Sequence, residues 1–120
     1  MQPDERDAAD LWDVRRFAQE LEEISEGMSV ESYASDMMRR RAVERLLTLI
    51  GEASRRISEP FRSAHPEIPW REIIGLRNLL THEYQRIENE EIWRIVSTSV
   101  PKLIGQVTAL LPPPPPTAEP

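Results

Sequence analysis

Apolar residues recur every three or four positions along most of this chain, and that spacing constrains the fold more than any other feature. It is the spacing of one face of an α-helix. It is clearest in two series: Leu11, Val14, Ala18 and Leu21, then Ile92, Val96, Val100, Leu103, Val107 and Leu110. No stretch alternates apolar and polar residues as a half-buried strand would. The sequence therefore predicts an all-α protein.

Four helices are predicted, over about residues 7–26, 30–58, 69–82 and 88–110. Gly27 is placed to end the first helix, and Ser29 is placed to cap the second. Gly51 lies inside the second helix, where we interpret it as a point of close approach by another helix. The prolines of residues 59–69 indicate a connector, and Pro101 is expected to bend the last helix without ending it.

Short connections between these helices favour an up-and-down four-helix bundle, in a single domain over residues 1–111. Residues 112–120 begin with five consecutive prolines and are expected to form a disordered polyproline tail. A bundle of this size buries a limited area. Its long apolar faces are therefore expected to leave surface that a second subunit covers, so we expect a homodimer.

The composition excludes several kinds of site. With no cysteine, the 120-residue chain can form neither disulfides nor thiolate zinc sites. Its two histidines, His65 and His82, are too few for a multi-histidine metal centre, and it has no glycine-rich phosphate-binding motif. We expect no metal and no cofactor. The net charge of −6 is concentrated in residues 1–31, which carry −7, whereas residues 36–62 hold seven arginines and four acids.

The sequence also bears on location. The first residues are acidic and lack the apolar stretch of a signal peptide. No apolar run approaches the ~20 residues that span a bilayer. We expect a soluble cytoplasmic protein that does not enter a membrane.

Residues 77–84 carry polar side chains suited to chemistry. Asn78 and His82 share a helix face, whereas Arg77 and His82 lie about 140° apart and can border one cleft formed with another helix or subunit. Histidine transfers protons near neutral pH, and a guanidinium stabilises charge on a phosphate. This set suffices for RNA cleavage by attack of a ribose 2′-hydroxyl, with a symmetric dimer supplying two histidines. From spacing alone, a capped helix end with surface side chains is the simpler interpretation.

The run RNLLTHEY, from Arg77 to Tyr84, closely resembles the signature of HepT-like toxins of the HEPN superfamily, which is Arg, a polar residue, any three residues, His, any residue and Tyr. Three further features fit the same family: Ile50-Gly51-Glu52-Ala53, Ile68-Pro69-Trp70, and Ile87 with Trp93. The resemblance spans about residues 30–110, and the first helix fits it loosely.

The resemblance implies a homodimeric, metal-independent ribonuclease with an HEPN-like fold, the toxin of a type VII-like toxin–antitoxin pair. Arg77 and His82 would be catalytic, with Asn78 as polar support. Tyr84 falls where family members carry a tyrosine that the antitoxin, an MNT-type nucleotidyltransferase, modifies with AMP. A bulky anionic group two residues from His82 would occlude the cleft and repel RNA phosphate. The alternative is a non-catalytic HEPN subunit that binds a nucleotidyltransferase.

Other residues have weaker indications. Three arginines are candidates for contact with RNA or a partner, although a solvated surface is the simpler interpretation: Arg39, Arg40 and Arg86. Trp70 and Trp93 are expected to anchor the packing at the starts of the last two helices. His65 is expected to be exposed in a loop. Glu52 is expected to pair with an arginine of its own helix or of the third.

Overall fold

The computed structural model describes residues 2–112, except for the side chain of Tyr84, and over that range it is helical with no strand. The prediction of an all-α fold is confirmed. The helical segments are α1 (Glu5–Ser25), α2 (Val30–Ser35), α3 (Met37–Arg56), α4 (Glu59–Ala64), α5 (Trp70–His82), the 3-10 turn η1 (Tyr84–Arg86), α6 (Asn89–Arg94), the π-helical segment η2 (Ile95–Ser99) and α7 (Val100–Leu110). Most of the expected polyproline tail, residues 113–120, lies outside the described range.

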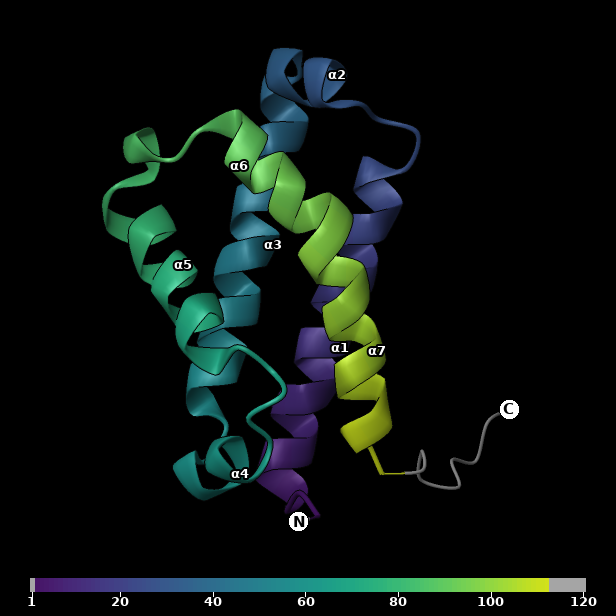
Figure 1. The fold of residues 1–120 in the computed structure, drawn as a ribbon, viewed down its shortest axis with the longest axis vertical. Coiled ribbons are helices and arrows are strands. Elements are labelled where there is room, and N and C mark those ends of the chain that lie inside the picture. Colours follow the sequence, from purple (N-terminus) through teal and green to yellow (C-terminus); the bar gives the residue numbers. More distant parts are fainter. Residues whose placement is uncertain (1, 113–120) are drawn as a thin grey trace.

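The long helices run side by side and enclose one apolar core (Figure 1). α3 packs against both α1 and α5, and α7 packs against α1 on the other side. The short helices close the two ends, with α2 against α6 at one end and α4 near the N-terminus at the other. No helix within residues 2–112 is long and apolar enough to cross a membrane.

α1 follows its predicted pattern. Its apolar residues are buried in one stripe: Leu11, Val14, Ala18 and Leu21. Asp4 caps the start by accepting a hydrogen bond of 2.7 Å from the backbone N–H of Asp7. Gly27 follows the last turn with φ +76°, a conformation that glycine adopts without steric cost. The prediction that Gly27 ends this helix is confirmed.

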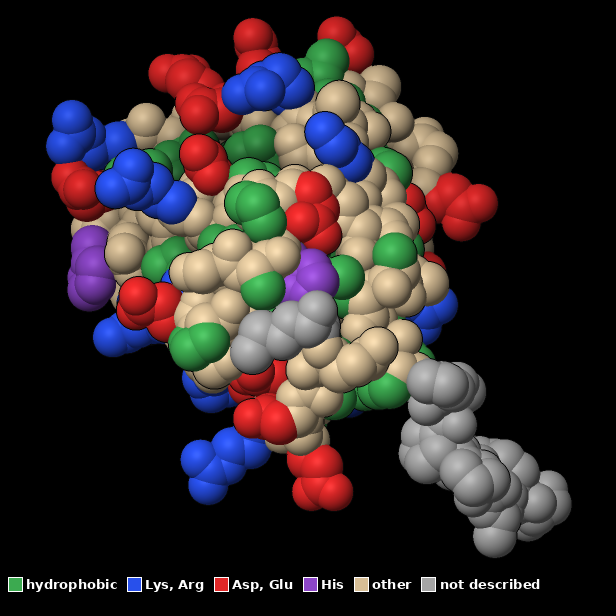
Figure 2. All heavy atoms as spheres, turned by 60° about the horizontal axis from the view of Figure 1, so that its bottom comes forward, with side chains coloured by type: hydrophobic (Ala, Val, Ile, Leu, Met, Phe, Trp, Pro, Cys, Tyr) green, Lys and Arg blue, Asp and Glu red, His purple; other side chains and the backbone are tan. Residues whose placement is uncertain are grey.

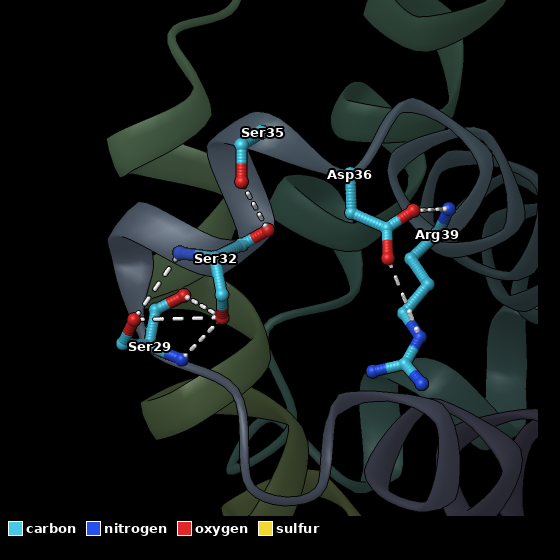
Figure 3. A network of polar contacts seen from close by, with 5 residues as sticks. All are labelled: Ser29, Ser32, Ser35, Asp36 and Arg39. Atoms are coloured by element: carbon cyan, nitrogen blue, oxygen red, sulfur yellow. Dashed lines mark hydrogen bonds and ion pairs between the residues drawn. The ribbon is translucent and has the colours of Figure 1, made fainter.

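The predicted second helix is wrong as a single element, because it breaks at Asp36. The backbone of Asp36 is extended, and its carboxylate accepts the N–H of Arg39 at 3.0 Å, which starts α3 anew (Figure 3). Before the break, Ser29 and Ser32 cap α2 reciprocally, each side chain accepting the other's backbone N–H, so the cap predicted at Ser29 is confirmed. A side-chain cap competes with continued helix for the same backbone groups.

The break lets α2 turn onto α6. Tyr33 is fully buried there, and its ring centroid lies 5.6 Å from that of Trp93. Burial is the main cause that raises the pKa of Tyr33 to about 12, with the nearby Glu44 carboxylate adding to it. The fully buried ring anchors α2 against α6, in keeping with the packing role predicted for Trp93.

The predicted connector of residues 59–69 is also partly wrong, since it contains α4. Ser58 caps α4 by accepting the N–H of Phe61, and Pro60 falls in the first turn, where a missing N–H has no cost. Phe61 is fully buried. Prolines in this segment therefore start a helix as well as end one.

His65 is not the exposed side chain that the sequence suggested. Its side chain is 14% exposed, its ring lies 4.4 Å from that of Phe61, and its Nδ1 is 3.4 Å from Glu67. The His65 carbonyl accepts a hydrogen bond of 3.0 Å from the Trp70 indole, and Trp70 itself is buried. The predicted anchoring role of Trp70 is thus confirmed, and His65 belongs to the same packing.

The last predicted helix is continuous in path but changes its hydrogen bonding. Pro101 has no N–H to donate, and the turns before it adopt π geometry, with the N–H of Val100 bonded to the carbonyl of Ile95. Five residues of the apolar series are buried, and Leu110 at its end is half-buried: Ile92, Val96, Val100, Leu103 and Val107 form the buried set. The expectation that Pro101 would not interrupt the pattern is confirmed.

A buried carboxylate ties the start of α1 to the start of α4. Asp7, 4% exposed, accepts hydrogen bonds from the backbone N–H of Ser58 at 2.8 Å and from its hydroxyl at 2.6 Å. Elsewhere at this end, acidic and basic side chains are interspersed over the surface (Figure 2). The contact between Asp7 and Ser58 joins residues 51 positions apart and depends on the Asp7 carboxylate.

Asp7→Ala should lower the free energy of unfolding by about 2–3 kcal/mol, because it removes two hydrogen bonds to a carboxylate and leaves the partly buried donors of Ser58 without that acceptor. Urea unfolding followed by circular dichroism measures this. Glu5→Ala is the matched control, since Glu5 is an exposed acid in the same first turn. Equal losses in the two variants would mean that only the helix dipole is involved.

Candidate active site

The polar segment predicted to carry chemistry forms the C-terminal half of α5 and the turn after it. α5 begins at Trp70, as predicted, and ends at His82, where the N–H of Glu83 returns to the carbonyl of Leu79 at 2.7 Å. Leu80 is buried on the inner side, whereas Asn78 and His82 are exposed. The helix thus presents its polar residues at the surface on a rigid support.

Arg77 is the least exposed charged group of this segment. Its side chain is 19% exposed and its guanidinium donates to Asn78 Oδ1 at 2.9 Å. One terminal nitrogen lies 3.7 Å from a Glu52 carboxylate oxygen on α3, and the buried Nε has no hydrogen-bond partner. The ion pair with Glu52 is one of the alternatives that the sequence left open. Arg77 is therefore held in position between an acid and an amide.

Gly51 is what allows Arg77 to lie there. A Cβ atom on Gly51 would stand 2.2 Å from the Arg77 Cβ and 3.2 Å from the carbonyl oxygen of Ile73. No side chain can occupy that space without moving α5 away from α3. The interpretation of Gly51 as a point of close helix approach is confirmed, and the residue that approaches it is Arg77.

His82 ends α5 with its side chain in solvent. Within the described residues it makes no hydrogen bond or ion pair. Arg77 and His82 do not contact each other, as expected for residues about 140° apart on a helix. The Asn78 amide is occupied by Arg77. A single chain thus carries the predicted groups on one helix but does not join them into one hydrogen-bonded unit.

A shallow groove adjoins Arg77, between α3 and α5. Four side chains line it: Glu52, Arg55, Arg56 and Arg77. Arg56 is tied to α1 through Asp10 at 3.0 Å and Asp13 at 3.9 Å. Arg56 is paired with acids of α1 and Arg77 with Glu52, so Arg55 leaves the groove with a positive local charge, which favours an anionic ligand.

The groove residues Arg55 and Arg56 were not singled out from the sequence. A signal was present, because residues 36–62 hold more arginines than acids. The signal did not say which of those arginines would lie beside Arg77, since that depends on the helix packing at Gly51.

The three arginines predicted to contact RNA or a partner are each bonded to another group of this chain. Arg39 pairs with Asp36 at 3.6 Å, Arg40 donates to the carbonyl of Ala34, and Arg86 pairs with Glu83 at 2.6 Å. Such exposed pairs contribute about 0–1 kcal/mol, so an incoming phosphate or carboxylate can replace them. Their role in binding RNA or a partner stays a prediction.

Tyr84 lies two residues beyond His82, at the first position of η1. Its backbone is described, whereas its side chain lies outside the described part of the chain. Residues 2–112 contain no group of three His, Asp or Glu side chains arranged to hold a metal ion. The described side chains of Arg77, Glu52, Asn78 and His82 supply guanidinium, carboxylate, amide and imidazole groups.

Comparison with known proteins gives a consistent result. A family model described as "Ribonuclease HepT-like" matches residues 14–110. The protein named "Putative RNase MJ1380" from Methanocaldococcus jannaschii is 39% identical over 97 residues, covering 81% of this chain and 89% of that protein. "Probable ribonuclease HepT" from Thermococcus cleftensis is 35% identical over 100 residues, covering 83% and 91%. No solved structure gives a significant match.

Gly51→Ala should destabilise the protein by about 1–3 kcal/mol, because the added methyl group overlaps the Arg77 side chain and forces α5 outward. Thermal and urea unfolding measure the loss. Gly105→Ala in α7 is the matched control: nothing lies within 4 Å of its added Cβ, so the change should stabilise the helix by up to about 1 kcal/mol. A neutral Gly51→Ala would contradict the close contact.

Proposed function

The chain belongs to the HepT-like ribonuclease family, and from this premise we propose that it is a metal-independent endoribonuclease that uses Arg77 and His82. One observation supports the assignment above others. Arg77 is held between Glu52 and Asn78 at the edge of a groove of positive charge, on the same helix that ends in an exposed histidine. A guanidinium held in this way is ready to bind a phosphate.

The proposed reaction is an internal transesterification of RNA. A base removes the proton of a ribose 2′-hydroxyl, whose oxygen attacks the adjacent phosphorus. The bond from phosphorus to the 5′-oxygen breaks, and an acid protonates that leaving oxygen. The products are a 2′,3′-cyclic phosphate and a 5′-hydroxyl. Arg77 would neutralise the added negative charge on the phosphate, and His82 would transfer protons.

This reaction asks for a base and an acid, and the chain offers one exposed histidine for them. His65 cannot assist, because it packs against Phe61 near the start of α5, whereas His82 lies at the end. We propose that a second copy supplies its own His82 and Arg77 across a two-fold axis. Asn78 would then keep each Arg77 in position.

The proposed biological setting is a toxin–antitoxin pair of the type VII kind. An MNT-type nucleotidyltransferase would act as antitoxin by adding AMP to Tyr84. This residue follows His82 by two positions, so a nucleotide there would add negative charge and bulk beside the proposed site. Both effects oppose the binding of RNA phosphate.

The purified protein should cleave RNA in the presence of EDTA and leave cyclic phosphate ends. His82→Ala and Arg77→Ala should each reduce the rate by about a hundredfold or more. Gel-based cleavage assays and end-group analysis by mass spectrometry measure both. His65→Ala is the control at the other histidine and should keep the wild-type rate if its fold, checked by thermal unfolding, is retained.

Full activity in His82→Ala would reject the assignment of His82. The absence of cleavage and of toxicity on expression, together with tight binding of the nucleotidyltransferase, would instead favour the non-catalytic binding subunit.

Co-expression with a cognate nucleotidyltransferase should add AMP to the protein, and Tyr84→Phe should abolish the addition because it removes the acceptor hydroxyl. Intact-mass measurement of both proteins tests this. RNA cleavage by the modified protein should be suppressed relative to unmodified protein. Equal AMP addition to the wild type and to Tyr84→Phe would assign the modification to another residue.

A further inference from the structure

Two arginines on the solvent face of α3 have no partner within the described residues. Arg45 and Arg55 are exposed, and neither makes a hydrogen bond or an ion pair there. The other four arginines of α3 are engaged: Arg39 with Asp36, Arg40 with Ala34, Arg41 with Glu44 and Arg56 with Asp10. Three of these guanidinium groups are paired with acids and one is bonded to a backbone carbonyl, which leaves Arg45 and Arg55 available.

Arg45 and Arg55 share a face with the groove. Glu52, which pairs with Arg77, lies seven residues after Arg45 and three before Arg55. At 3.6 residues per turn, these separations place both arginines within about 60° of Glu52 around α3. Arg55 lines the groove together with Glu52 and Arg77.

The two arginines also lie on opposite sides of Arg77 along the helix axis. Arg77 packs at Gly51, so Arg45 lies about 9 Å before that contact and Arg55 about 6 Å after it. α5 lies beside α3 and runs in the opposite direction (Figure 1). His82, at the end of α5, is therefore displaced from Arg77 toward the Arg45 side.

We propose that Arg45 and Arg55 bind backbone phosphates of the substrate on the two sides of Arg77, so that RNA lies along α3 as an extended single strand. This rests on the proposed ribonuclease function and names the form of RNA that the site takes. A guanidinium without an internal partner gives up no ion pair when it binds a phosphate, and its planar donors fit two phosphate oxygens. A row of such groups along one helix matches a linear polyanion.

The test measures RNA binding without cleavage, in the His82→Ala chain, by fluorescence anisotropy of a labelled single-stranded oligouridylate. Adding Arg55→Gln or Arg45→Gln should each weaken binding about fourfold at physiological salt and lower the salt slope by about 0.7, the value for one lost phosphate contact. The double change should combine both losses. Arg55→Lys should restore the salt slope and part of the affinity, because it keeps the charge but loses the paired donors.

Arg94→Gln is the matched control. Arg94 is exposed on α6, likewise has no partner in the described chain, and lies outside the groove. Replacing it with glutamine makes the same change in net charge as Arg45→Gln or Arg55→Gln. It should leave affinity and salt slope nearly unchanged. Equal thermal stability of all the variants would establish that folding is not the cause of any difference.

Several outcomes separate the two proposals. If the wild type cleaves RNA but Arg55→Gln and Arg45→Gln match Arg94→Gln in affinity, the phosphate-binding role is wrong and the ribonuclease proposal stands. If the variants lose affinity while the wild type cleaves no RNA, the binding role stands and the catalytic proposal fails. Loss of nucleotidyltransferase binding with RNA binding unchanged would mean that these arginines serve a protein partner, which overturns the inference.

Discussion

The arrangement of the site depends on an absent side chain. Because Gly51 has no Cβ, the backbone of α3 lies against the stem of Arg77, and α5 packs closer than two substituted helices could. That proximity buries most of the Arg77 stem and brings its guanidinium within 3.7 Å of Glu52, the residue after Gly51. Two adjacent residues of α3 therefore serve one residue of α5: the first makes room for it and the second supplies its counter-charge.

The rest of the fold keeps these two helices in place. α3 is flanked by α1 on its other side, where Arg56 bonds to Asp10 across the helix pair. The loop between α3 and α5 is fixed by Ser58, which both caps α4 and donates to the buried Asp7. Trp70, the first residue of α5, donates its indole N–H to the His65 carbonyl, so the position of α5 along α3 is fixed at its start as well as at Gly51.

Periodicity and capping predicted much of this fold. The apolar spacing in α1 and in the last helical column gave the correct buried residues, because each series lies on one stripe of a helix. The sequence did not predict the break at Asp36, because apolar residues keep a helical spacing across it, from Tyr33 before the break to Met37 and Met38 after it. Both methionines are more than half exposed, so the continued apolar pattern there did not represent a buried face.

The site was predictable to a different degree. The run from Arg77 to Tyr84 marked the correct segment, and Gly51 was correctly interpreted as a contact point. That the two belong together could not be read from the chain, because they are 26 positions apart and joined only by packing. The same holds for Arg55, whose neighbour in the groove is Arg77. Local patterns identify residues with a role, whereas the partner of each comes from tertiary structure.

The overall charge of −6 does not oppose the binding of RNA once the charges are placed. Asp10 and Asp13 of α1 are directed at Arg56, on the side of α3 that faces α1. Their field at Arg55 and at the far side of α3 is reduced by that pairing, and salt largely screens exposed charges that lie more than about 10 Å apart. Net charge governs weak non-specific attraction, but a ligand phosphate in the groove meets the nearest groups first. The groove is lined by three guanidinium groups and one carboxylate, and that carboxylate, on Glu52, is already paired with Arg77.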